Sequence, residues 1–265
     1  MEDDLKIIVL VKQVPDSTDV RLDPASGILK RDRNKGIANP EDKYAVEMAL
    51  GIREKNGGTI TVLSMGPETA KDTLKEALAM GADEAMLISD PALAGSDVAT
   101  TAKVLAAAIE AIGAPDLILC GRRSIDGSCG AVGPMLAELL KLSLVSDVRK
   151  LDHNAGQLLA EQVWDETIRV IEAATPAVVT VSREAKAPRL ANAMGIMKAA
   201  KKPMTVRALA ELGLSPDSVG LAGAVTKVTR VATPERKRRV QAWEGANPAA
   251  FSELNQKLAA KGLLS

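Results

Sequence analysis

Four apolar segments of strand length recur along the first half of the chain. They cover residues 5–11 (LKIIVLV), 59–65 (TITVLSM), 84–89 (EAMLIS) and 116–120 (DLILC). Their apolar residues are continuous rather than alternating with polar ones, which is typical of strands buried on both faces of a sheet. Continuous runs of this kind predict a parallel sheet.

Helical patterns separate these predicted strands. Residues 40–56 follow Asn39, a favourable N-cap, and start with Pro40 before Gly57 ends the pattern. Residues 67–80 and 97–112 form two further helical patterns. The alternation of strands and helices predicts a doubly wound α/β fold with a mostly parallel sheet, whose ligands lie beyond the carboxyl ends of the strands.

The stretch from residue 116 to residue 140 combines a buried strand, a glycine-rich loop and an amphipathic helix. Gly127, Gly130 and Gly133 lack a Cβ atom, so the backbone there can approach a ligand and adopt positive φ angles. The free N–H groups in the first turn of the following helix favour an anion such as a phosphate. Glycines also occur in turns for steric reasons alone, and this simpler interpretation stays open for the loop taken by itself.

Three familiar motifs of nucleotide and hydrolase sites are absent from the sequence. GxxxxGK[ST], GxGxxG and GxSxG do not occur, which argues against a P-loop enzyme, a dinucleotide fingerprint and a nucleophile elbow. The remaining interpretation is a Rossmann-like adenine-nucleotide site without hydrolytic machinery. No catalytic acid, base or nucleophile is assigned.

The composition limits the partners and the chemistry. The 34 basic and 34 acidic residues cancel, so no overall field attracts nucleic acid or an anionic membrane. Aromatic residues make up 2% of the chain, so a large planar ligand would be held by backbone, aliphatic and polar contacts. The 2 cysteines and 1 histidine are too few for a conventional zinc or iron–sulfur site, so no metal is expected. Because the chain shows neither a long apolar run nor a secretory signal, we expect a cytoplasmic protein without membrane insertion.

Beyond residue 145 the pattern changes. Residues 157–164 and 167–173 predict a hairpin that turns at Asp165 and Glu166, and residues 177–182 predict another buried strand. After residue 190 the chain is rich in loops and proline, and it has too few periodic segments to form a core of its own. We therefore predict a nucleotide-binding domain over residues 1–190 and a C-terminal arm over residues 191–265 that wraps around a partner.

Several sequence blocks resemble one known family. They are VKQVPD (residues 11–16), NPEDKYAVEMAL (39–50), SMGP (64–67), ALAMGAD (77–83), CGRRSIDGSCGAVGP (120–134), PAVVTVSREAKAPR (176–189) and GIMKAAKKP (195–203). They resemble the beta subunit of electron transfer flavoprotein, in the family's order and across most of the chain. The resemblance implies a redox subunit that acts only within a complex. Its partner would be an alpha subunit holding the redox-shuttling FAD, while the beta subunit holds a second adenine nucleotide.

The resemblance also implies which residues form the nucleotide site. They are Leu10, Asn39, Pro40, Glu41, Asp42, Met65, Gly66, Asp126, Gly127, Ser128, Cys129, Gly130, Ala131, Val132, Gly133 and Pro134. All lie at strand ends or just beyond, where Asn39 and Asp42 would contact ribose or adenine and the glycine loop would hold phosphate. The family usually has an acid, a threonine and a glutamine where this chain has Ser128, Cys129 and Ala131.

Two segments resemble the electron-bifurcating subgroup of that family. They cover residues 11–29 (VKQVPDSTDVRLDPASGIL) and 89–102 (SDPALAGSDVATTA), and in the subgroup the AGSD segment runs along the flavin. Thr101 matches one hydroxyl residue of the helix that follows, while Val98 replaces a threonine at the other position. The resemblance implies that the beta subunit binds FAD and takes electrons from NADH. One electron would pass to ferredoxin or flavodoxin, and the other through the alpha subunit to a flavin dehydrogenase.

Two alternatives stay open. An ordinary electron transfer flavoprotein beta subunit would hold AMP and accept electrons from acyl-CoA dehydrogenases. A stand-alone adenine-nucleotide sensor or an ATP-using enzyme would share the same scaffold. In the family, residues 195–202 resemble the loop that recognises dehydrogenases.

Overall fold

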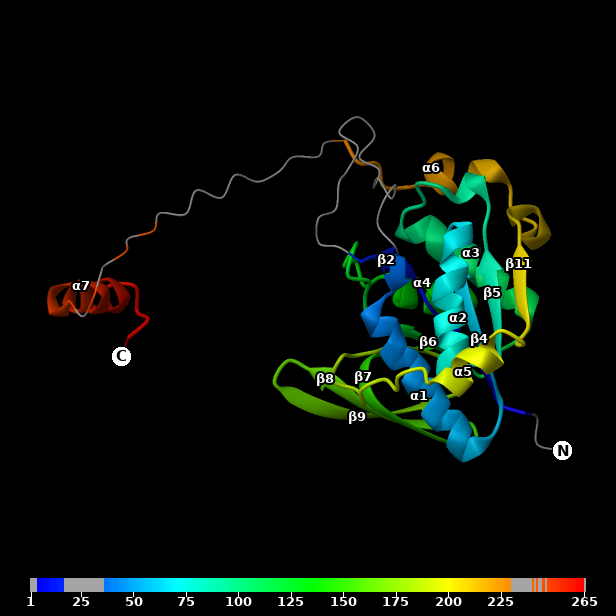
Figure 1. Ribbon diagram of the computed structural model, residues 1–265, viewed down its shortest axis with the longest axis horizontal. Coiled ribbons are helices and arrows are strands. Elements are labelled where there is room, and N and C mark those ends of the chain that lie inside the picture. Colours follow the sequence, from blue (N-terminus) through cyan, green and yellow to red (C-terminus); the bar gives the residue numbers. More distant parts are fainter. Residues whose placement is uncertain are drawn as a thin grey trace. The chain divides into compact units, whose positions relative to one another are not determined.

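A nine-stranded sheet organises most of the chain (Figure 1). The computed structural model describes residues 4–16, 36–229, 240, 242, 245 and 247–264, and in these the strand order is β11-β5-β4-β1-β6-β10-β7-β8-β9. The strands are β1 (Lys6–Leu10), β4 (Thr59–Met65), β5 (Glu84–Ile88), β6 (Leu117–Gly121), β7 (Ser143–Asn154), β8 (Gln157–Trp164), β9 (Thr167–Ala174), β10 (Ala177–Val181) and β11 (Met204–Arg207). Neighbours pair in parallel from β11 to β7, and β8 and β9 add an antiparallel hairpin. A separate antiparallel pair consists of β2 (Gln13–Pro15) and β3 (Gly36–Ala38).

Helices cover both faces of the parallel part of the sheet. Helices α1 (Pro40–Asn56), α2 (Lys71–Met80) and α5 (Ala193–Ala199) lie on one face, which is the near side in Figure 1. Helices α3 (Val98–Ile112) and α4 (Val132–Leu140) lie on the other face. Short helical turns complete this unit: η1 (Glu68–Ala70), η2 (Pro91–Leu93), η3 (Leu209–Leu212), η4 (Pro216–Ser218) and α6 (Gly220–Gly223).

The hydrophobic core has two layers, one on each side of the sheet. In β1, Ile7 and Val9 point to the layer under α1 and α2, while Ile8 and Leu10 point to the layer under α3 and α4. Successive side chains of a strand point to opposite faces, so a strand buried on both sides needs a continuous apolar run. The continuous runs therefore correctly predicted the parallel strands β1, β4, β5, β6 and β10, and the doubly wound α/β fold is confirmed.

The C-terminal boundary differs from the predicted one. Contacts between Cα atoms divide the chain into Met1–Thr229 and Arg230–Ser265 rather than at residue 190. Residues 191–229 belong to the first unit because β11 extends the sheet beside β5 and α5 packs on α2. In the second unit the structure describes helix α7 (Pro248–Ala259), whose Phe251 is exposed. No helix among the described residues has the length and apolar character that crossing a bilayer requires.

The chain reverses its direction of strand addition first at β1, and it later crosses the sheet again from β10 to β11. From β1 it proceeds outward to β4 and β5, and it then crosses to β6 on the other side of β1. The reversal at β1 is a topological switch point. In folds of this class the ligand crevice lies at such a point, at the carboxyl edge of the sheet, which here is beside the loops after β1 and β6.

Candidate functional site

The loops that follow β1 and β6 meet at the switch point. Lys12, just beyond β1, places its Nζ atom 2.7 Å from Asp126 Oδ1 and 3.3 Å from Ser124 Oγ in the loop after β6. Burial raises the pKa of Asp126, but the hydrogen bonds from Lys12 and Ser124 outweigh it and leave the pKa lowered. An ion pair thus spans the crevice, and Lys12 contributes a cation that the predicted set of site residues did not include.

The glycine loop offers backbone donors at this crevice. Ser128 and Gly130 have φ angles of 52° and 66°, and Ser128 N donates to Ser124 O at 2.9 Å to close the turn. Among the described residues, the N–H groups of Cys129, Gly130 and Ala131 make no hydrogen bond. Helix α4 begins directly after them, at Val132, with the free N–H groups of its first turn. Donors in this arrangement suit an anion such as a phosphate.

The three glycines of the loop have different roles. A Cβ atom on Gly127 would meet Ser124 Oγ at 3.7 Å, an ordinary contact, whereas Gly130 needs its positive φ angle. A Cβ atom on Gly133 would lie 2.6 Å from Thr180 Cγ2 and 3.1 Å from Cys120 Sγ. Gly133 therefore lets α4 pack closely on β10 and β6. We assign it to packing rather than to phosphate contact.

Asn39 holds the loop after β6 instead of capping α1. It occupies the predicted N-cap position, but its side chain makes no capping hydrogen bond. Its Nδ2 atom donates to Arg123 O at 3.1 Å and its Oδ1 atom accepts from Ile125 N at 3.1 Å. Asn39 is fully buried, so its side chain connects two elements of the protein.

Asp42 joins the ends of β1 and β6. Its carboxylate accepts from Lys12 N at 2.8 Å, from Asn39 Nδ2 at 2.9 Å and from Gly121 N at 3.2 Å. Burial raises the pKa of Asp42 to about 7, although these three donors and the Lys12 charge oppose the rise. Gly121 ends β6 beneath α1, where a Cβ atom would lie 2.5 Å from Asp42 Oδ1, so a larger residue would separate strand and helix.

Glu41 completes this group of inward-facing polar residues. Its buried carboxylate accepts from Arg123 N at 2.9 Å, and Arg183 Nε lies 2.9 Å away on the chain that leaves β10. The side chains of Asn39, Glu41 and Asp42 are thus committed to intramolecular hydrogen bonds. The structure favours a positioning role for them rather than the expected contact of Asn39 and Asp42 with ribose or adenine.

The other predicted residues line the same edge of the sheet. Leu10 ends β1 in the core, Pro40 begins α1, Met65 ends β4, and Gly66 follows it. Gly66 N donates to Ile88 O at 3.0 Å, which ties the loop after β4 to the end of β5. Residues 17–29, part of the first segment that resembles the bifurcating subgroup, lie outside the described residues.

The loop of residues 90–97 lies further along the edge. It follows β5, which is separated from β6 by β1 and β4, so three strand spacings of about 4.8 Å place the two loops about 14 Å apart. Helix α3 begins after Asp97 with Thr101 half-buried in its first turn, and α3 packs against α4 on one face of the sheet. Two helices that pack together thus begin at the edge where the predicted ligand lies.

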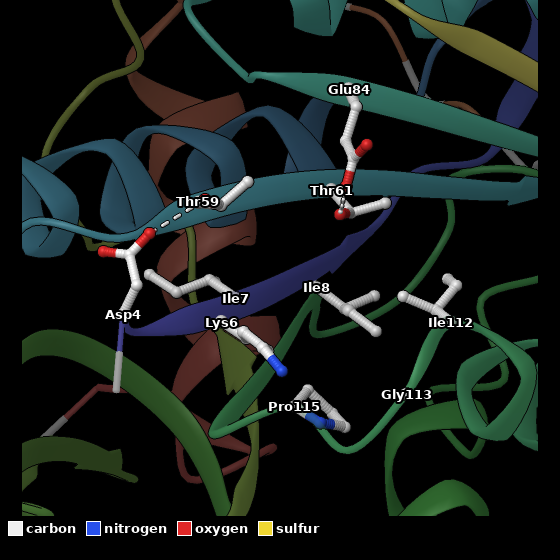
Figure 2. Close-up of a pocket in the computed structure, with 10 residues that line it drawn as sticks. All are labelled: Asp4, Lys6, Ile7, Ile8, Thr59, Thr61, Glu84, Ile112, Gly113 and Pro115. Atoms are coloured by element: carbon white, nitrogen blue, oxygen red, sulfur yellow. Dashed lines mark hydrogen bonds between the residues drawn. The ribbon is translucent and has the colours of Figure 1, made fainter. Parts of the chain in front are cut away.

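A pocket of about 240 Å³ lies at the opposite edge of the sheet (Figure 2). Its lining includes Ile7, Thr59 and Glu84 at or near the amino ends of β1, β4 and β5, with Ile112 and Gly113 from the end of α3. The Glu84 carboxylate points at Thr61, and its Oε1 atom accepts a hydrogen bond from Thr61 Oγ1 at 2.8 Å. Because ligands of a doubly wound sheet bind at its carboxyl edge, we do not assign a nucleotide to this pocket.

Fold and site together define a doubly wound α/β protein with a glycine-rich loop of unpaired backbone N–H groups at its switch point. The model of the electron transfer flavoprotein domain matches residues 26–212. The chain is 41% identical over 255 residues, 96% of its length and 98% of the relative's, to the electron transfer flavoprotein subunit beta of Thermoanaerobacterium thermosaccharolyticum. It is 38% identical over 234 residues, 88% of its length and 89% of the relative's, to the caffeyl-CoA reductase-Etf complex subunit CarD of Acetobacterium woodii. A Mycobacterium leprae electron transfer flavoprotein subunit beta is 40% identical over 235 residues, 86% of this chain and 88% of the relative.

The chain therefore belongs to the electron transfer flavoprotein family, as a beta subunit. Membership implies electron transport within a heterodimer that includes an alpha subunit. It argues against the stand-alone sensor or ATP-using enzyme.

Proposed function

We propose that this beta subunit binds FAD and takes electrons from NADH for flavin-based electron bifurcation. One electron would go to a low-potential carrier such as ferredoxin or flavodoxin, and the other to a partner dehydrogenase through the FAD of the alpha subunit. The observation that carries the proposal is the pair of packed helices α3 and α4, each of which begins at the carboxyl edge beside a loop suited to one end of an extended dinucleotide.

The phosphate end would lie on the glycine loop. The N–H groups of Cys129, Gly130 and Ala131 donate to no other group among the described residues, and the first turn of α4 adds its own donors. Lys12 supplies a positive charge at the crevice, although Asp126 already neutralises part of it. Asn39 and Asp42 would hold the loop in shape from below without touching the ligand.

The flavin end would extend toward the loop of residues 90–97 and Thr101. When bound there, FAD would supply the redox chemistry, accepting a hydride and delivering its two electrons separately, while the chain supplies position and electrostatics. With 2% aromatic residues, the chain would hold the ring by backbone groups and by the Thr101 hydroxyl. AMP would leave this part of the edge without a ligand.

Partner contacts would involve two segments in the C-terminal part of the chain. The second unit, Arg230–Ser265, would contact the alpha subunit. Helix α5 would meet the dehydrogenase, because Met194, Ile196 and Met197 are 65%, 59% and 73% exposed on so short a helix. The similarity to a subunit of a caffeyl-CoA reductase-Etf complex supports a tight association of this kind.

The ordinary AMP-holding beta subunit is the second candidate. Val98, the first residue of α3, lacks the hydroxyl found at this position in the bifurcating subgroup, which removes one of two possible hydroxyl contacts. The glycine loop would serve AMP equally well.

An anaerobic titration of the purified heterodimer with NADH tests the proposal. We expect direct reduction of flavin without any added dehydrogenase. Thr101→Val should change the spectrum and reduction potential of the second flavin more than its occupancy, while Thr167→Val, the same change in the distant β8–β9 hairpin, should change neither. If a heterodimer that contains two FAD is not reduced by NADH, then NADH is not its electron donor.

A further inference from the structure

The loop of residues 90–97 is fastened at both ends to the C-terminal part of the first unit. At one end, Asp90 accepts from Ala92 N at 2.9 Å with Oδ1 and from Leu209 N at 3.2 Å with Oδ2. At the other end, Asp97 accepts from Thr100 N at 2.9 Å with Oδ1 and from Thr226 N at 2.8 Å with Oδ2. Each carboxylate therefore uses one oxygen within its own segment and the other on residues 209–226.

The middle of the loop is held by close backbone packing. Leu221 N donates to Ala94 O at 3.0 Å. Gly220 has a φ angle of 58°, and a Cβ atom there would lie 1.9 Å from Ala92 O, so no other residue fits without displacement of the loop. Gly95, with a φ angle of 77°, leaves room for Leu221, whose Cβ atom would be 3.0 Å from an added Cβ. Residues 209–226 thus form a brace, the name used below, along the whole loop.

Asp97 stays ionised over the physiological pH range. The hydrogen bond from Thr100 N lowers its pKa most, burial opposes this, and the bond from Thr226 N adds to the lowering, which brings the pKa to about 2. The Thr100 hydroxyl lies 2.9 Å from the same Oδ1 atom. Because hydrogen bonds to a charged group are stronger than neutral ones, Asp97 fixes the start of α3 and the end of the brace against each other.

We propose that the Asp97–Thr226 hydrogen bond is a specificity-determining contact, which sets the loop of residues 90–97 in the position that accepts the flavin end of FAD. The proposal rests on the function proposed above. AMP would contact only the glycine loop, which makes no hydrogen bond to the brace among the described residues. Loss of the contact would weaken FAD binding and leave AMP binding unchanged, so Asp97 is a positioning residue for one ligand and not for the other.

Two variants remove the contact from opposite sides. Asp97→Asn keeps an oxygen that can cap α3, since asparagine and aspartate are equally good N-caps, but replaces the oxygen that accepts from Thr226 with a donor. Thr226→Pro removes the donor and leaves Asp97 intact. Lys103→Met is the matched control, because Lys103 Nζ lies 3.4 Å from Ser218 O and contacts the brace without touching Asp97.

The measurement is the FAD to AMP ratio at the second nucleotide site after the intact heterodimer is exchanged against equimolar FAD and AMP. We expect the ratio to fall about tenfold in each variant, the size of one lost hydrogen bond to a charged group, and to fall no further in the double variant. The control should keep the ratio of the unmodified heterodimer, and the FAD of the alpha subunit should stay in place throughout. A purely structural role would instead lower the thermal midpoint and both nucleotides together.

Two results would overturn the proposal, and they are distinguishable. If the unmodified heterodimer prefers FAD and the variants show the same FAD to AMP ratio, Asp97 has no such role and the proposed function still stands. An unmodified heterodimer that takes only AMP would remove both.

Discussion

Gly130 lies in the loop after β6 and Gly133, three positions later, lies in the first turn of α4, and their substitution should fail in different ways. Gly133→Val would push a branched side chain into Thr180 and Cys120, costing about 1–3 kcal/mol of folding free energy. Gly130→Val would meet Arg122 O at 3.4 Å and face a φ angle of 66°, which costs about 1–2 kcal/mol and distorts the backbone donors. We expect Gly133→Val to lower the thermal midpoint first and Gly130→Val to lose nucleotide first.

Nucleotide content and thermal unfolding, measured on the same preparations, separate these two outcomes. Gly127→Ala is the control, because a Cβ atom there would make only an ordinary contact with Ser124 Oγ, at 3.7 Å. Equal loss of nucleotide at equal stability in both valine variants would assign Gly133 to the ligand after all.

Asp42 should make the stability of the chain depend on pH. Its pKa is about 7 in the folded chain and 3.8 in the ordinary, unfolded environment, so the folded state binds more protons between these values. Stability therefore falls as pH rises through this window, by up to about 1.4 kcal/mol per pH unit for one proton. Asp42→Asn carries no titrating group, and urea unfolding should show it gaining about 2 kcal/mol relative to the unmodified chain between pH 5 and pH 7. A constant difference across that range would show that Asp42 stays ionised.

At the scale of elements, the continuous apolar runs were sufficient to predict the parallel strands, but not β7. Its sequence SLVSDVRKLDHN contains many charged residues, and its register shifts between Val148 and Lys150, next to Asp147 with a φ angle of 54°. A bulge of this kind breaks the period of two that identifies an exposed strand. The four residues of β11 are too few for any period, and only pairing with β5 makes them a strand.

The polar residues of the site could likewise be predicted from the sequence only in part. The motif NPED predicted the start of α1, and the glycines predicted the loop, because both depend on local backbone geometry. The direction of the Asn39 and Asp42 side chains depends on residues 84 and 79 positions away in the chain, so spacing could not predict it. Lys12 could have been noticed as a basic residue directly after the first strand.

A second element-scale feature is the segment of residues 183–189, which runs along α1. The Glu47 side chain is 2% exposed and accepts from Lys186 Nζ at 2.8 Å and from Arg189 Nε at 2.7 Å. Burial raises the pKa of Glu47, but these donors outweigh it and lower the pKa from 4.5 to about 2. This contribution to stability is present above pH 4.5 and is lost as pH falls toward 2.

Glu47→Gln should therefore lower the stability of the chain at pH 7 by about 2 kcal/mol, because it leaves two cations without their buried partner. Glu54→Gln, which removes the 51% exposed partner of the same Arg189, should cost less than about 1 kcal/mol. Thermal unfolding of both variants is the measurement, with hydrogen exchange over residues 183–189 to locate the change. Equal losses in the two variants would show that burial of Glu47 adds nothing.

At the scale of the whole molecule, the residues of the candidate site gather at one edge of the sheet. The carboxyl edge holds the glycine loop, the inward-facing residues of α1 and the braced loop of residues 90–97. The β8–β9 hairpin extends the sheet on one side, and β11 is the outer strand on the other side. Family membership assigns the chain to a heterodimer. The proposed function places FAD at the second nucleotide site of that heterodimer.

The central claim is that this second nucleotide is FAD, and nucleotide analysis of the denatured heterodimer tests it most directly. The purified heterodimer is unfolded, the released FAD and AMP are separated, and each is quantified against protein. The account predicts two FAD per heterodimer and no retained AMP, because it proposes that a dinucleotide extends from the glycine loop to the loop of residues 90–97. One FAD with one AMP would contradict it and make this protein an ordinary, AMP-holding beta subunit.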